Sequence, residues 1–375
     1  MTQADDSRPP RWGDAPWQIS VEIPTRPLPS RCQVAVIGAG FAGLSTAYHL
    51  ARRGARVVVL EAEAIGAGAS GRTGGLVLEG TAAGPLEHVD HCIDAIAAVV
   101  AERAIACDLT LTGCWQVRHE REAAGRRPGW RDGDHWIVVA GTEPGGTVDA
   151  GKLVAGLAQA AGALGAEIHP RTPVRAIDVR GTTDYRVRCD RGELVAEHVV
   201  VALNAYTTQL LTLPVRFRSA LTLALCTAPV DAATLDAIGL ADRLPFYTLD
   251  MPYLWGRCLA DQRLVFGAGL VFPDDGDVRS VQIDDRDAVE SMARLETRVH
   301  ALHPALGDLA VTHRWGGPIA FRHDGVPILS RVPGMDGVIA FAGCAGHGVA
   351  LGVCVGQLIA AAIVDGAALP AWGAV

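Results

Sequence analysis

The sequence predicts an α/β (α+β) protein of two parts, in which a domain assembled from separated segments around a parallel sheet carries an inserted antiparallel-sheet domain. Three observations predict this fold. Residues 33–60 have the pattern of a buried strand, a helix and a second buried strand, the order that parallel pairing requires. Residues 218–272 alternate as short strands instead. Buried strand and helix patterns then return towards the C-terminus.

The first unit is defined by three elements and the signals between them. Gln33–Ile37 is a run of apolar residues that indicates a buried strand, and Phe41–Arg53 has helical periodicity. Gly54 ends the predicted helix, and Arg56–Leu60 is a second apolar strand. A strand–helix–strand unit of this length predicts two parallel neighbours in one sheet.

Later elements follow from the same patterns, and they predict the domain organisation. The expected order is a helix over 86–114, irregular polar sequence up to Gly146, a helix over 150–164, a strand at 167–169, a meander of strands at 175–179, 185–189 and 193–201, a hairpin of strands 253–259 and 263–267, a charged helix over 285–302, and a buried strand at 338–341 before a glycine turn and a packed helix. We predict an N-terminal arm over 1–30, a nucleotide-binding domain from 31–85, 146–213 and 306–375, and a substrate or cap domain from 86–145 and 214–305.

The composition is that of a globular protein with a large core, because 49% of the 375 residues are hydrophobic and 20% are charged. A net charge of −8 disfavours nucleic acid as the main partner. Residues 1–17 lack the apolar run of a secretory signal, and glycines interrupt the uncharged stretch 337–364, so no membrane span is expected. Nine cysteines without a CxxC pair indicate free thiols, and we expect a cytoplasmic protein.

The strongest chemical motif joins the first strand to the first helix. Residues 38–43 have the sequence Gly-Ala-Gly-Phe-Ala-Gly, a GxGxxG turn that allows close approach of a pyrophosphate to a helix N-terminus. Glu61 follows the second strand, 18 residues after Gly43, where a carboxylate can accept hydrogen bonds from ribose hydroxyls. This context predicts a Rossmann-like dinucleotide site.

Two further glycine-rich turns are expected to converge on the same dinucleotide. Residues 66–75 (GAGASGRTGG) cannot form a stable helix interior and are expected to present backbone amides to a cofactor. Residues 343–349 lie between a buried strand and a helix, so they form a second helix N-terminus that would stabilise a developing negative charge.

Taken together, these motifs resemble the FAD-dependent D-amino-acid oxidase superfamily, which includes glycine oxidase, sarcosine oxidase and γ-glutamylputrescine oxidoreductase. The resemblance covers residues 31–366 and adds Trp-Gly-Gly at 315–317 and Asp-Gly-Val-Pro at 324–327. The loop at 66–75 and the Asn-Ala-Tyr element at 204–206 are most similar to the γ-glutamylputrescine oxidoreductase-like branch.

The resemblance implies a set of site residues around a non-covalent FAD. The implied cofactor residues are Gly38, Gly40, Phe41, Ala42, Gly43, Glu61, Ala62, Ser70, Arg72, Thr73, Gly74, Val174, Gly343, Gly346, His347, Gly348 and Val349. The implied catalytic or substrate-facing residues are Tyr247, Tyr253 and His347, with Trp255 and Ile319 in the substrate pocket. No metal is expected.

Departures from the family pattern bear on the substrate and the electron acceptor. Amino-acid-oxidising relatives have an arginine that binds the substrate carboxylate at the position of Ile319, and Arg322 would point to the other face of a strand. An amine without an adjacent carboxylate is therefore favoured. Several oxidases of the family have a lysine near flavin N5, but the matching residues 263–266 are Arg-Leu-Val-Phe and Lys152 is the only lysine.

The resulting hypothesis is an FAD-dependent oxidoreductase that transfers a hydride from the CH–NH bond of a small amine to flavin N5, after which the imine is hydrolysed. Oxygen or an electron carrier would reoxidise the flavin. The alternatives are a dehydrogenase or biosynthetic tailoring enzyme that does not use oxygen, and a non-catalytic FAD-binding subunit. For His347, a role in backbone placement is favoured over base catalysis. The sequence leaves the amine, the acceptor, the oligomeric state and any role of Cys344 open.

Overall fold

The computed structural model describes residues 11–180 and 184–375, which form two compact units. The parallel-sheet unit comprises residues 17–110, 147–219 and 319–375, and the antiparallel-sheet unit comprises the described residues 11–16 together with 111–146 and 220–318. Three segments of one unit alternate with three of the other, so the chain passes between them five times. This division differs from the predicted boundaries, because it splits the predicted arm after Pro16 and assigns 86–110 to the parallel-sheet unit.

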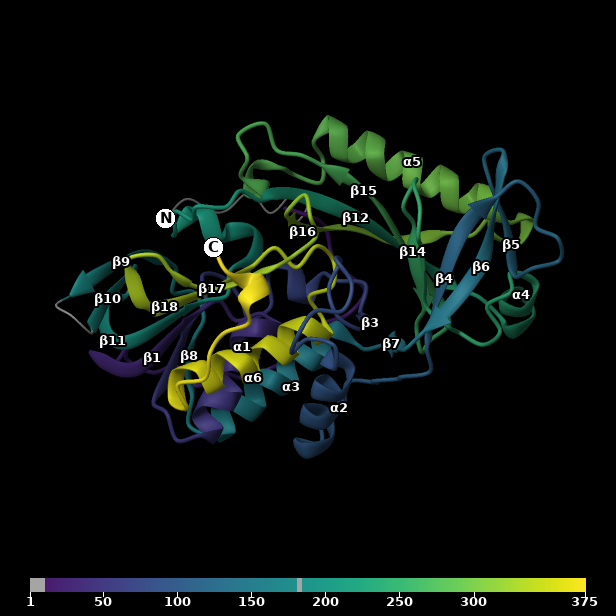
Figure 1. Cartoon of the computed structure of the whole chain (residues 1–375). Helices are drawn as coiled ribbons and strands as arrows, with labels where there is room; N and C mark the ends of the chain where they lie inside the picture. The colour runs from purple at the N-terminus through teal and green to yellow at the C-terminus, as the bar shows by residue number, and fades with distance from the viewer. Residues whose placement is uncertain (1–10, 181–183) are drawn as a thin grey trace. The chain divides into compact units, whose positions relative to one another are not determined.

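The parallel-sheet unit is built on a sheet with the strand order β17-β18-β11-β1-β2-β8 (Figure 1). Strands β18, β11, β1, β2 and β8 pair in parallel, whereas β17 is antiparallel at one edge, and β10 and β9 extend from β11 as an antiparallel meander. The bounds are β1 Arg31–Ile37, β2 Val57–Leu60, β8 Glu167–His169, β9 Val174–Arg180, β10 Asp184–Cys189, β11 Gly192–Val201, β17 Ile328–Val332 and β18 Met335–Ala342.

Helices cover one face of this sheet because its strands alternate their apolar side chains between two cores. Val34 and Val36 of β1 face the helices, whereas Ala35 and Ile37 pack in a second core that includes β10 and β11. Figure 1 shows the helices together below the sheet: α1 Phe41–Arg52, α2 Cys92–Glu102, α3 Ala150–Ala163 and α6 Ala350–Val364. Within 11–180 and 184–375, no helix combines the length and apolarity that crossing a membrane would require.

The antiparallel-sheet unit contains a sheet with the strand order β16-β12-β15-β14-β13-β4-β6-β5. Its neighbouring strands with resolved register are antiparallel except for β13 and β4, which are parallel. The bounds are β4 Cys114–Glu120, β5 Pro128–Asp132, β6 His135–Glu143, β12 Arg218–Pro229, β13 Phe246–Thr248, β14 Trp255–Cys258, β15 Arg263–Val271 and β16 Val311–Phe321, with helices α4 Ala232–Ala237 and α5 Arg286–Leu302. Two further strands among the described residues, β3 Leu76–Leu78 and β7 Gly145–Thr147, pair with each other.

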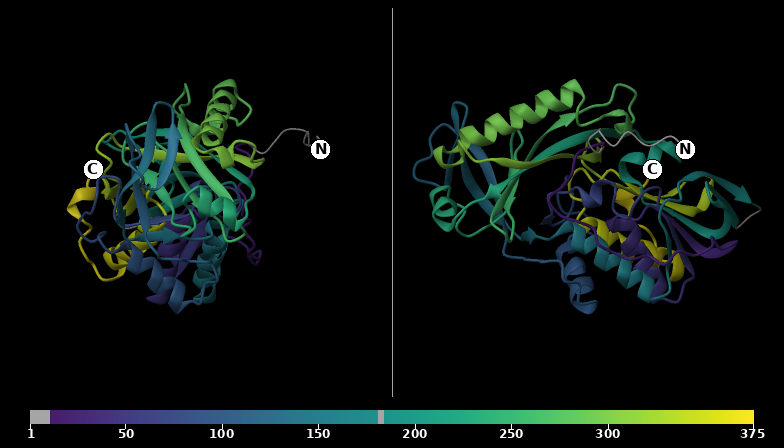
Figure 2. Two further views of the ribbon diagram at one scale, coloured as in Figure 1. Left: turned by 90° about the vertical axis from the view of Figure 1, so that its right-hand side faces the viewer. Right: turned by 180° about the vertical axis from the view of Figure 1, so that it is seen from behind.

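A cluster of aromatic residues forms part of the core of the antiparallel-sheet unit. Helix α5 runs along the sheet (Figure 2) and contacts β15 and β5. Trp130, Phe246 and Phe266 are almost fully buried and pack edge to face or tilted, with ring centroids 4.8 Å apart for Trp130 and Phe246. These aromatic residues anchor the sheet from one side.

The predicted α/β class is confirmed, but two predicted segments are wrong. Residues 115–146 were expected to be irregular, and they form β4, β5, β6 and the start of β7. The helix expected over 86–114 is limited to Cys92–Glu102. Its start is set by Glu79, whose carboxylate accepts hydrogen bonds from the first backbone N–H groups, and a positive φ of 49° at Ala104 prevents its continuation.

A partly buried charged cluster joins α5 to the sheet and to the turn before β14. The ring of His119 lies between two carboxylates, with Nε2 2.8 Å from Asp132 Oδ2 and Nδ1 2.8 Å from Asp250 Oδ1. Arg298 of α5 donates to Asp132, with Nη2 2.6 Å from Oδ2, and also to the backbone carbonyls of residues 252 and 253 at 2.8 Å. The cluster therefore stabilises the turn that leads into β14.

The acid stability of the protein should depend on Asp132. Burial by itself would raise the pKa of Asp132, but hydrogen bonds from Arg298 and His119 outweigh burial and lower it below the ordinary 3.8. Unfolding restores the ordinary value, so the carboxylate stabilises the fold above about pH 4 and loses this contribution as the pH falls through the folded-state pKa. We expect the free energy of unfolding to fall from about pH 4 to 2, and to fall less steeply in Asp132→Asn. Urea titrations across this range measure both slopes, and equal slopes would contradict the assignment.

Candidate active site

The glycine turn of residues 38–43 links β1 to α1 and has no room for side chains at two positions. Gly38 has φ 105°, and a Cβ there would lie 2.7 Å from the carbonyl oxygen of Ala202. A Cβ at Gly43 would lie 1.9 Å from the carbonyl oxygen of Gly38. Gly40 and Ala42 are partly exposed, so the first turn of α1 is accessible from outside. This helix has no side-chain cap at Gly40 and no acidic residue in its first turn.

Glu61 connects the end of β2 to this turn. Its Oε2 accepts a hydrogen bond from the Ala39 N–H at 2.7 Å, and its Oε1 accepts one from the Glu63 N–H at 3.0 Å. Burial raises the pKa of Glu61 in spite of these bonds. Each carboxylate oxygen keeps a second lone pair, so further donors such as hydroxyl groups can bind.

The second glycine-rich segment packs directly on the first. Gly66 N–H donates to the Ala39 carbonyl at 3.1 Å, and Phe41 N–H donates to Ser70 Oγ at 3.0 Å. Ser70 Oγ thus satisfies one N–H at the start of α1, and a Cβ at Gly40 would lie 2.7 Å from it. Arg72 Nε donates to the Ala67 carbonyl at 3.2 Å, which holds the loop closed.

Other predicted residues of this unit lie in the same region of the chain. Thr73 is partly exposed and its Oγ1 accepts from the Gly75 N–H at 3.4 Å, whereas Gly74 is buried and Ala62 is exposed. Val174 begins β9, whose one strand partner within the described residues is β10. Thr172 N–H donates to the Glu61 carbonyl at 2.7 Å, which connects the segment before β9 to the end of β2.

The third glycine-rich turn, residues 343–349, joins β18 to α6. Three of its residues have left-handed φ values, 76° at Gly343, 50° at Ala345 and 90° at Gly346. Asn204 supports the turn, because its Oδ1 accepts from Gly343 N–H at 2.9 Å and from Cys344 N–H at 3.3 Å. Local sequence does not indicate this role of Asn204, because it depends on a contact across 139 residues.

The N-terminal ends of α1 and α6 approach each other closely. A Cβ at Gly352 would lie 3.2 Å from Phe41 Cβ, and a Cβ at Gly356 would lie 2.4 Å from Ser45 Oγ. Ser45 Oγ also donates to the Val353 carbonyl at 2.6 Å. The structure therefore brings the three glycine-rich turns together, as expected, because the second contacts the first and the third begins the helix packed against α1.

The remaining predicted residues near this turn are His347, Gly348, Val349 and Ile319. The N–H of His347 donates to the Cys344 carbonyl at 2.9 Å, and burial lowers the pKa of its ring. Burial raises the pKa of the Cys344 thiol to about 12, which keeps it protonated at neutral pH. Ile319 Cδ1 lies 3.9 Å from the Cβ position of Gly346, and Gly348 is partly exposed whereas Val349 is buried.

Arg322, the guanidinium nearest in sequence to Ile319, is bound elsewhere. Its Nη2 lies 2.7 Å from Asp324 Oδ2 in an ion pair. Position 319, which holds a carboxylate-binding arginine in the amino-acid-oxidising pattern, is therefore apolar, and the next arginine along the chain has a carboxylate partner in Asp324.

Three of the predicted substrate-facing residues, Tyr247, Tyr253 and Trp255, belong to the antiparallel-sheet unit. Tyr247 of β13 pairs with Trp255 of β14, and the absence of a side chain at Gly267 makes room for the indole, since a Cβ there would lie 2.1 Å from Trp255 Cζ2. Tyr253 was expected on the same strand as Trp255, but it lies in the turn before β14, where its side chain is 41% exposed. The prediction that both share one strand is wrong, because Arg298 holds the turn through its carbonyls.

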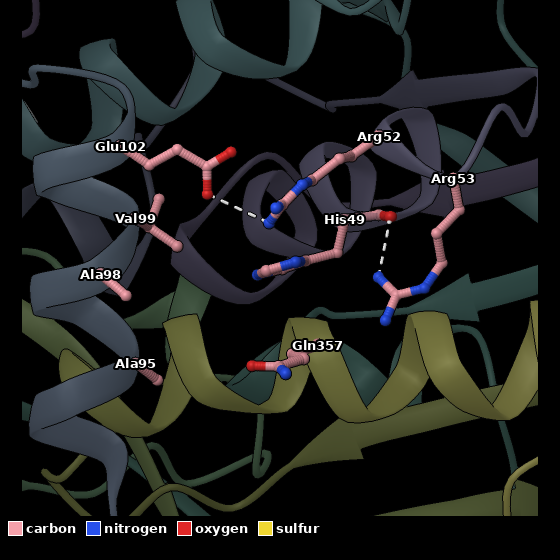
Figure 3. A pocket seen from close by; sticks show the side chains of 8 residues that line it. All are labelled: His49, Arg52, Arg53, Ala95, Ala98, Val99, Glu102 and Gln357. Atoms are coloured by element: carbon pink, nitrogen blue, oxygen red, sulfur yellow. Dashed lines mark hydrogen bonds and ion pairs between the residues drawn. The ribbon is translucent and has the colours of Figure 1, made fainter.

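The parallel-sheet unit has a cavity of about 380 Å³ (Figure 3). It is lined by the C-terminal end of α1, by α2 and by Gln357 of α6. Across it, Arg52 Nη1 and Glu102 Oε2 form an ion pair at 3.0 Å. The ring of His49 points into it, and burial together with the nearby arginines lowers the pKa of His49 to about 4. None of its eight lining residues is a predicted site residue. Its two arginines, Arg52 and Arg53, lie near the C-terminal ends of α1 and α2, where a positive charge interacts favourably with the helix dipole.

Comparison with known proteins identifies the family. The model of the FAD dependent oxidoreductase family, DAO, matches residues 33–362. The γ-glutamylputrescine oxidoreductase of Escherichia coli (strain K12) is 26% identical over 376 residues, which cover 88% of this chain and 83% of that protein. The probable oxidoreductase OrdL of Haemophilus influenzae is 26% identical over 383 residues, covering 88% and 82%.

Solved structures show the same fold. Glycine oxidase from Geobacillus kaustophilus superposes with a TM-score of 0.71 at 21% identity, covering 91% of this chain and 96% of that chain. L-proline dehydrogenase from P. horikoshii has a TM-score of 0.71 at 18% identity, covering 92% and 96%. The resemblance found in the glycine-rich motifs is thereby confirmed, and the chain belongs to the DAO family of FAD-dependent oxidoreductases.

Proposed function

We propose that this protein oxidises the CH–NH bond of a small amine that has no carboxylate beside the reacting carbon. The observation that carries the proposal is the convergence of three glycine-rich turns at the N-terminal ends of α1 and α6, together with Ile319 next to the third turn. An apolar side chain in this position cannot bind a carboxylate in the bidentate way an arginine does. The glycine oxidase and γ-glutamylputrescine oxidoreductase relatives support an amine or amino acid as the substrate class.

The residues of the parallel-sheet unit fit the dinucleotide that the family uses. Gly40 and Ala42 leave the first turn of α1 accessible, where its N–H groups and helix dipole would bind a pyrophosphate. Glu61 has unused lone pairs for ribose hydroxyls. When bound, FAD supplies a two-electron acceptor for the amine. We expect it to be held non-covalently, because burial keeps the Cys344 thiol protonated.

The protein's own contribution would be positioning rather than strong acid–base chemistry. The lowered pKa of His347 keeps its ring neutral at pH 7, and its backbone N–H is used within the turn. The left-handed turn at 343–349 would direct backbone groups towards the cofactor. Tyr247 and Trp255 would orient the amine from the sheet, so that the substrate carbon is held for transfer and the imine product is then hydrolysed.

An enzyme that does not use oxygen is the second candidate, and one observation favours it. The only lysine, Lys152, belongs to α3 and its Nζ lies 2.6 Å from Asp108 in an ion pair. Residues 263–266 of β15 supply arginine and apolar side chains instead. An electron carrier would then replace oxygen as the acceptor. The nine free cysteines support a reducing, cytoplasmic location.

Purified protein should bind FAD, and its flavin should be reduced by an amine in the absence of oxygen. The visible absorption band of the oxidised flavin would be recorded during titration with primary and secondary amines and with the matching α-amino acids. Bleaching by amines, but not by amino acids, is the expected result. Protein that binds no FAD, or whose flavin no amine bleaches, would overturn the proposal. A peroxide assay after admission of air separates an oxidase from an enzyme that uses an electron carrier.

A further inference from the structure

Two buried thiols on different helices of the parallel-sheet unit face each other. Cys92 is the first residue of α2, and Cys354 lies in the first half of α6. Both are almost fully buried in the same core. Ala95 and Gln357, each three residues after one of these cysteines, line the same cavity (Figure 3). Residues three apart on a helix share a face, so the two cysteines lie on the facing sides of α2 and α6.

The turn before α2 brings the two sulfur atoms together. Cys92 Sγ donates to the Val89 carbonyl at 3.3 Å, and Cys354 Sγ donates to the His88 carbonyl at 3.7 Å. The two carbonyls belong to neighbouring peptide groups, so both sulfurs contact one short segment of backbone. The thiols are also hydrogen-bond partners of each other. The geometry therefore gives a dithiol pair rather than two isolated buried cysteines.

The contact between the thiols gives them different reactivities. When Cys354 ionises, the Cys92 S–H can donate to it instead of to the carbonyl. This hydrogen bond lowers the pKa of the Cys354 thiol against the effect of burial, and the nearby His91 lowers it further. The same contact, together with burial, raises the pKa of Cys92. The thiolate is the nucleophilic form of cysteine, so Cys354 should react first and Cys92 should attack the product.

The backbone segment that contacts the two sulfurs lies at the surface. Within residues 86–91, Glu87, His88 and His91 are exposed. The segment is tied to the C-terminal part of the chain, because Trp372 Nε1 donates to the Glu87 carbonyl at 2.8 Å. Exposed segments of this kind open locally at a lower free energy than the whole fold. A small oxidant can therefore reach the thiols without unfolding of the unit.

We propose that Cys92 and Cys354 form a reversible disulfide that links α2 to α6 in the presence of hydrogen peroxide. The Cys354 sulfur attacks one peroxide oxygen, the O–O bond breaks, and hydroxide leaves and takes up the thiol proton as water, with a sulfenic acid left on Cys354. The Cys92 sulfur then attacks the Cys354 sulfur, the S–O bond breaks, and a second water leaves. The two thiols lose two electrons and two protons, and peroxide is reduced to water.

The link would respond to oxidising conditions at the helix on which α1 packs. Cys354 lies between Gly352 and Gly356, the two glycines of α6 that approach α1 closely. A bond between residues 92 and 354 also restricts the unfolded chain, so the oxidised protein should be more stable than the reduced protein. A thiol reductant would reverse both effects. The inference concerns a modification site and does not depend on the amine oxidation proposed above.

Non-reducing peptide mapping of the folded full-length protein tests this disulfide. Protein treated with a small excess of hydrogen peroxide and then alkylated should yield two peptides joined through Cys92 and Cys354, which dithiothreitol separates. The midpoint of thermal unfolding should rise by about 2–8 °C on oxidation and return on reduction. In Cys92→Ala, the joined peptides should be absent, and dimedone should trap the sulfenic acid on Cys354. In Cys354→Ala, both signals should be absent.

Cys107→Ala is the matched control, because Cys107 is buried in the same core and burial raises the pKa of its thiol. This variant should form the link and gain stability as the wild type does. Thermal unfolding of each reduced variant reports whether its fold is intact. The wild-type peptide map decides the proposal even if a variant fails to fold. Thiols that stay reduced in the folded protein, a peroxide product that joins other cysteines, or sulfinic acid on Cys354 without a link would each overturn the proposal.

Discussion

Replacing Arg298 by methionine is expected to lower the free energy of unfolding by about 3–5 kcal/mol, because it leaves a buried carboxylate without its main partner. The side chains of Arg298 and Asp132 are 16% and 10% exposed, so water cannot replace the lost bonds. Methionine fills much of the same volume without a charge, which limits the effect of lost packing. Urea denaturation monitored by tryptophan fluorescence measures the change.

Arg294→Met provides the control for this prediction. Arg294 lies one turn earlier on α5, its side chain is 69% exposed, and it pairs with Glu290 at 3.9 Å. Surface pairs of this kind contribute about 0–1 kcal/mol, so the control should be close to wild type. Similar losses in the two variants would mean that the cluster of Arg298, Asp132 and His119 does not stabilise the unit.

Replacing Gly43 by alanine should abolish FAD retention and destabilise the parallel-sheet unit by about 2–3 kcal/mol or more. The new methyl group would lie 1.9 Å from the Gly38 carbonyl oxygen, so the turn and the first residues of α1 must separate. Both the start of the helix and the Ala39–Glu61 hydrogen bond depend on this turn. Flavin content after purification and the midpoint of thermal unfolding are the measurements.

Gly162→Ala is the matched substitution for comparison. Gly162 lies near the end of α3, and a Cβ there would meet no atom within 4 Å. Alanine in a helix is favoured over glycine by about 0.5–1 kcal/mol, so this variant should retain FAD and be at least as stable as wild type. A Gly43→Ala protein with normal FAD content would show that the close approach of helix and turn is not needed.

Local sequence patterns predicted the parallel-sheet unit well because its elements follow one another along the chain. The strand–helix–strand unit around α1, the short strand β8 and the meander of β9 to β11 lie within a residue or two of their predicted bounds. Buried parallel strands are continuous apolar runs, which periodicity detects directly. The expected fold class follows from these elements.

The antiparallel-sheet unit was harder to predict because its strands are half-polar and pair over long distances. Strand β4 contains arginine, histidine and glutamate. One of its neighbours, β6, is close in the chain, but the other, β13, is distant: the paired residues Gln116 and Tyr247 are 131 residues apart. No local pattern indicates such a pairing. The role of Asn204 was missed for the same reason, since it depends on a partner that only the folded chain brings near.

The alternation of segments between the two units has a consequence for synthesis on the ribosome. The parallel sheet needs β18 beside β11, and α1 needs α6 against its surface, yet both β18 and α6 come from residues 319–375. The nascent N-terminal strand and helix therefore stay without their packing partners until nearly the whole polypeptide has been translated. Loss of even the last forty or so residues would remove the helix packed on α1, so a truncated product should be degraded rather than accumulate as a stable half-protein.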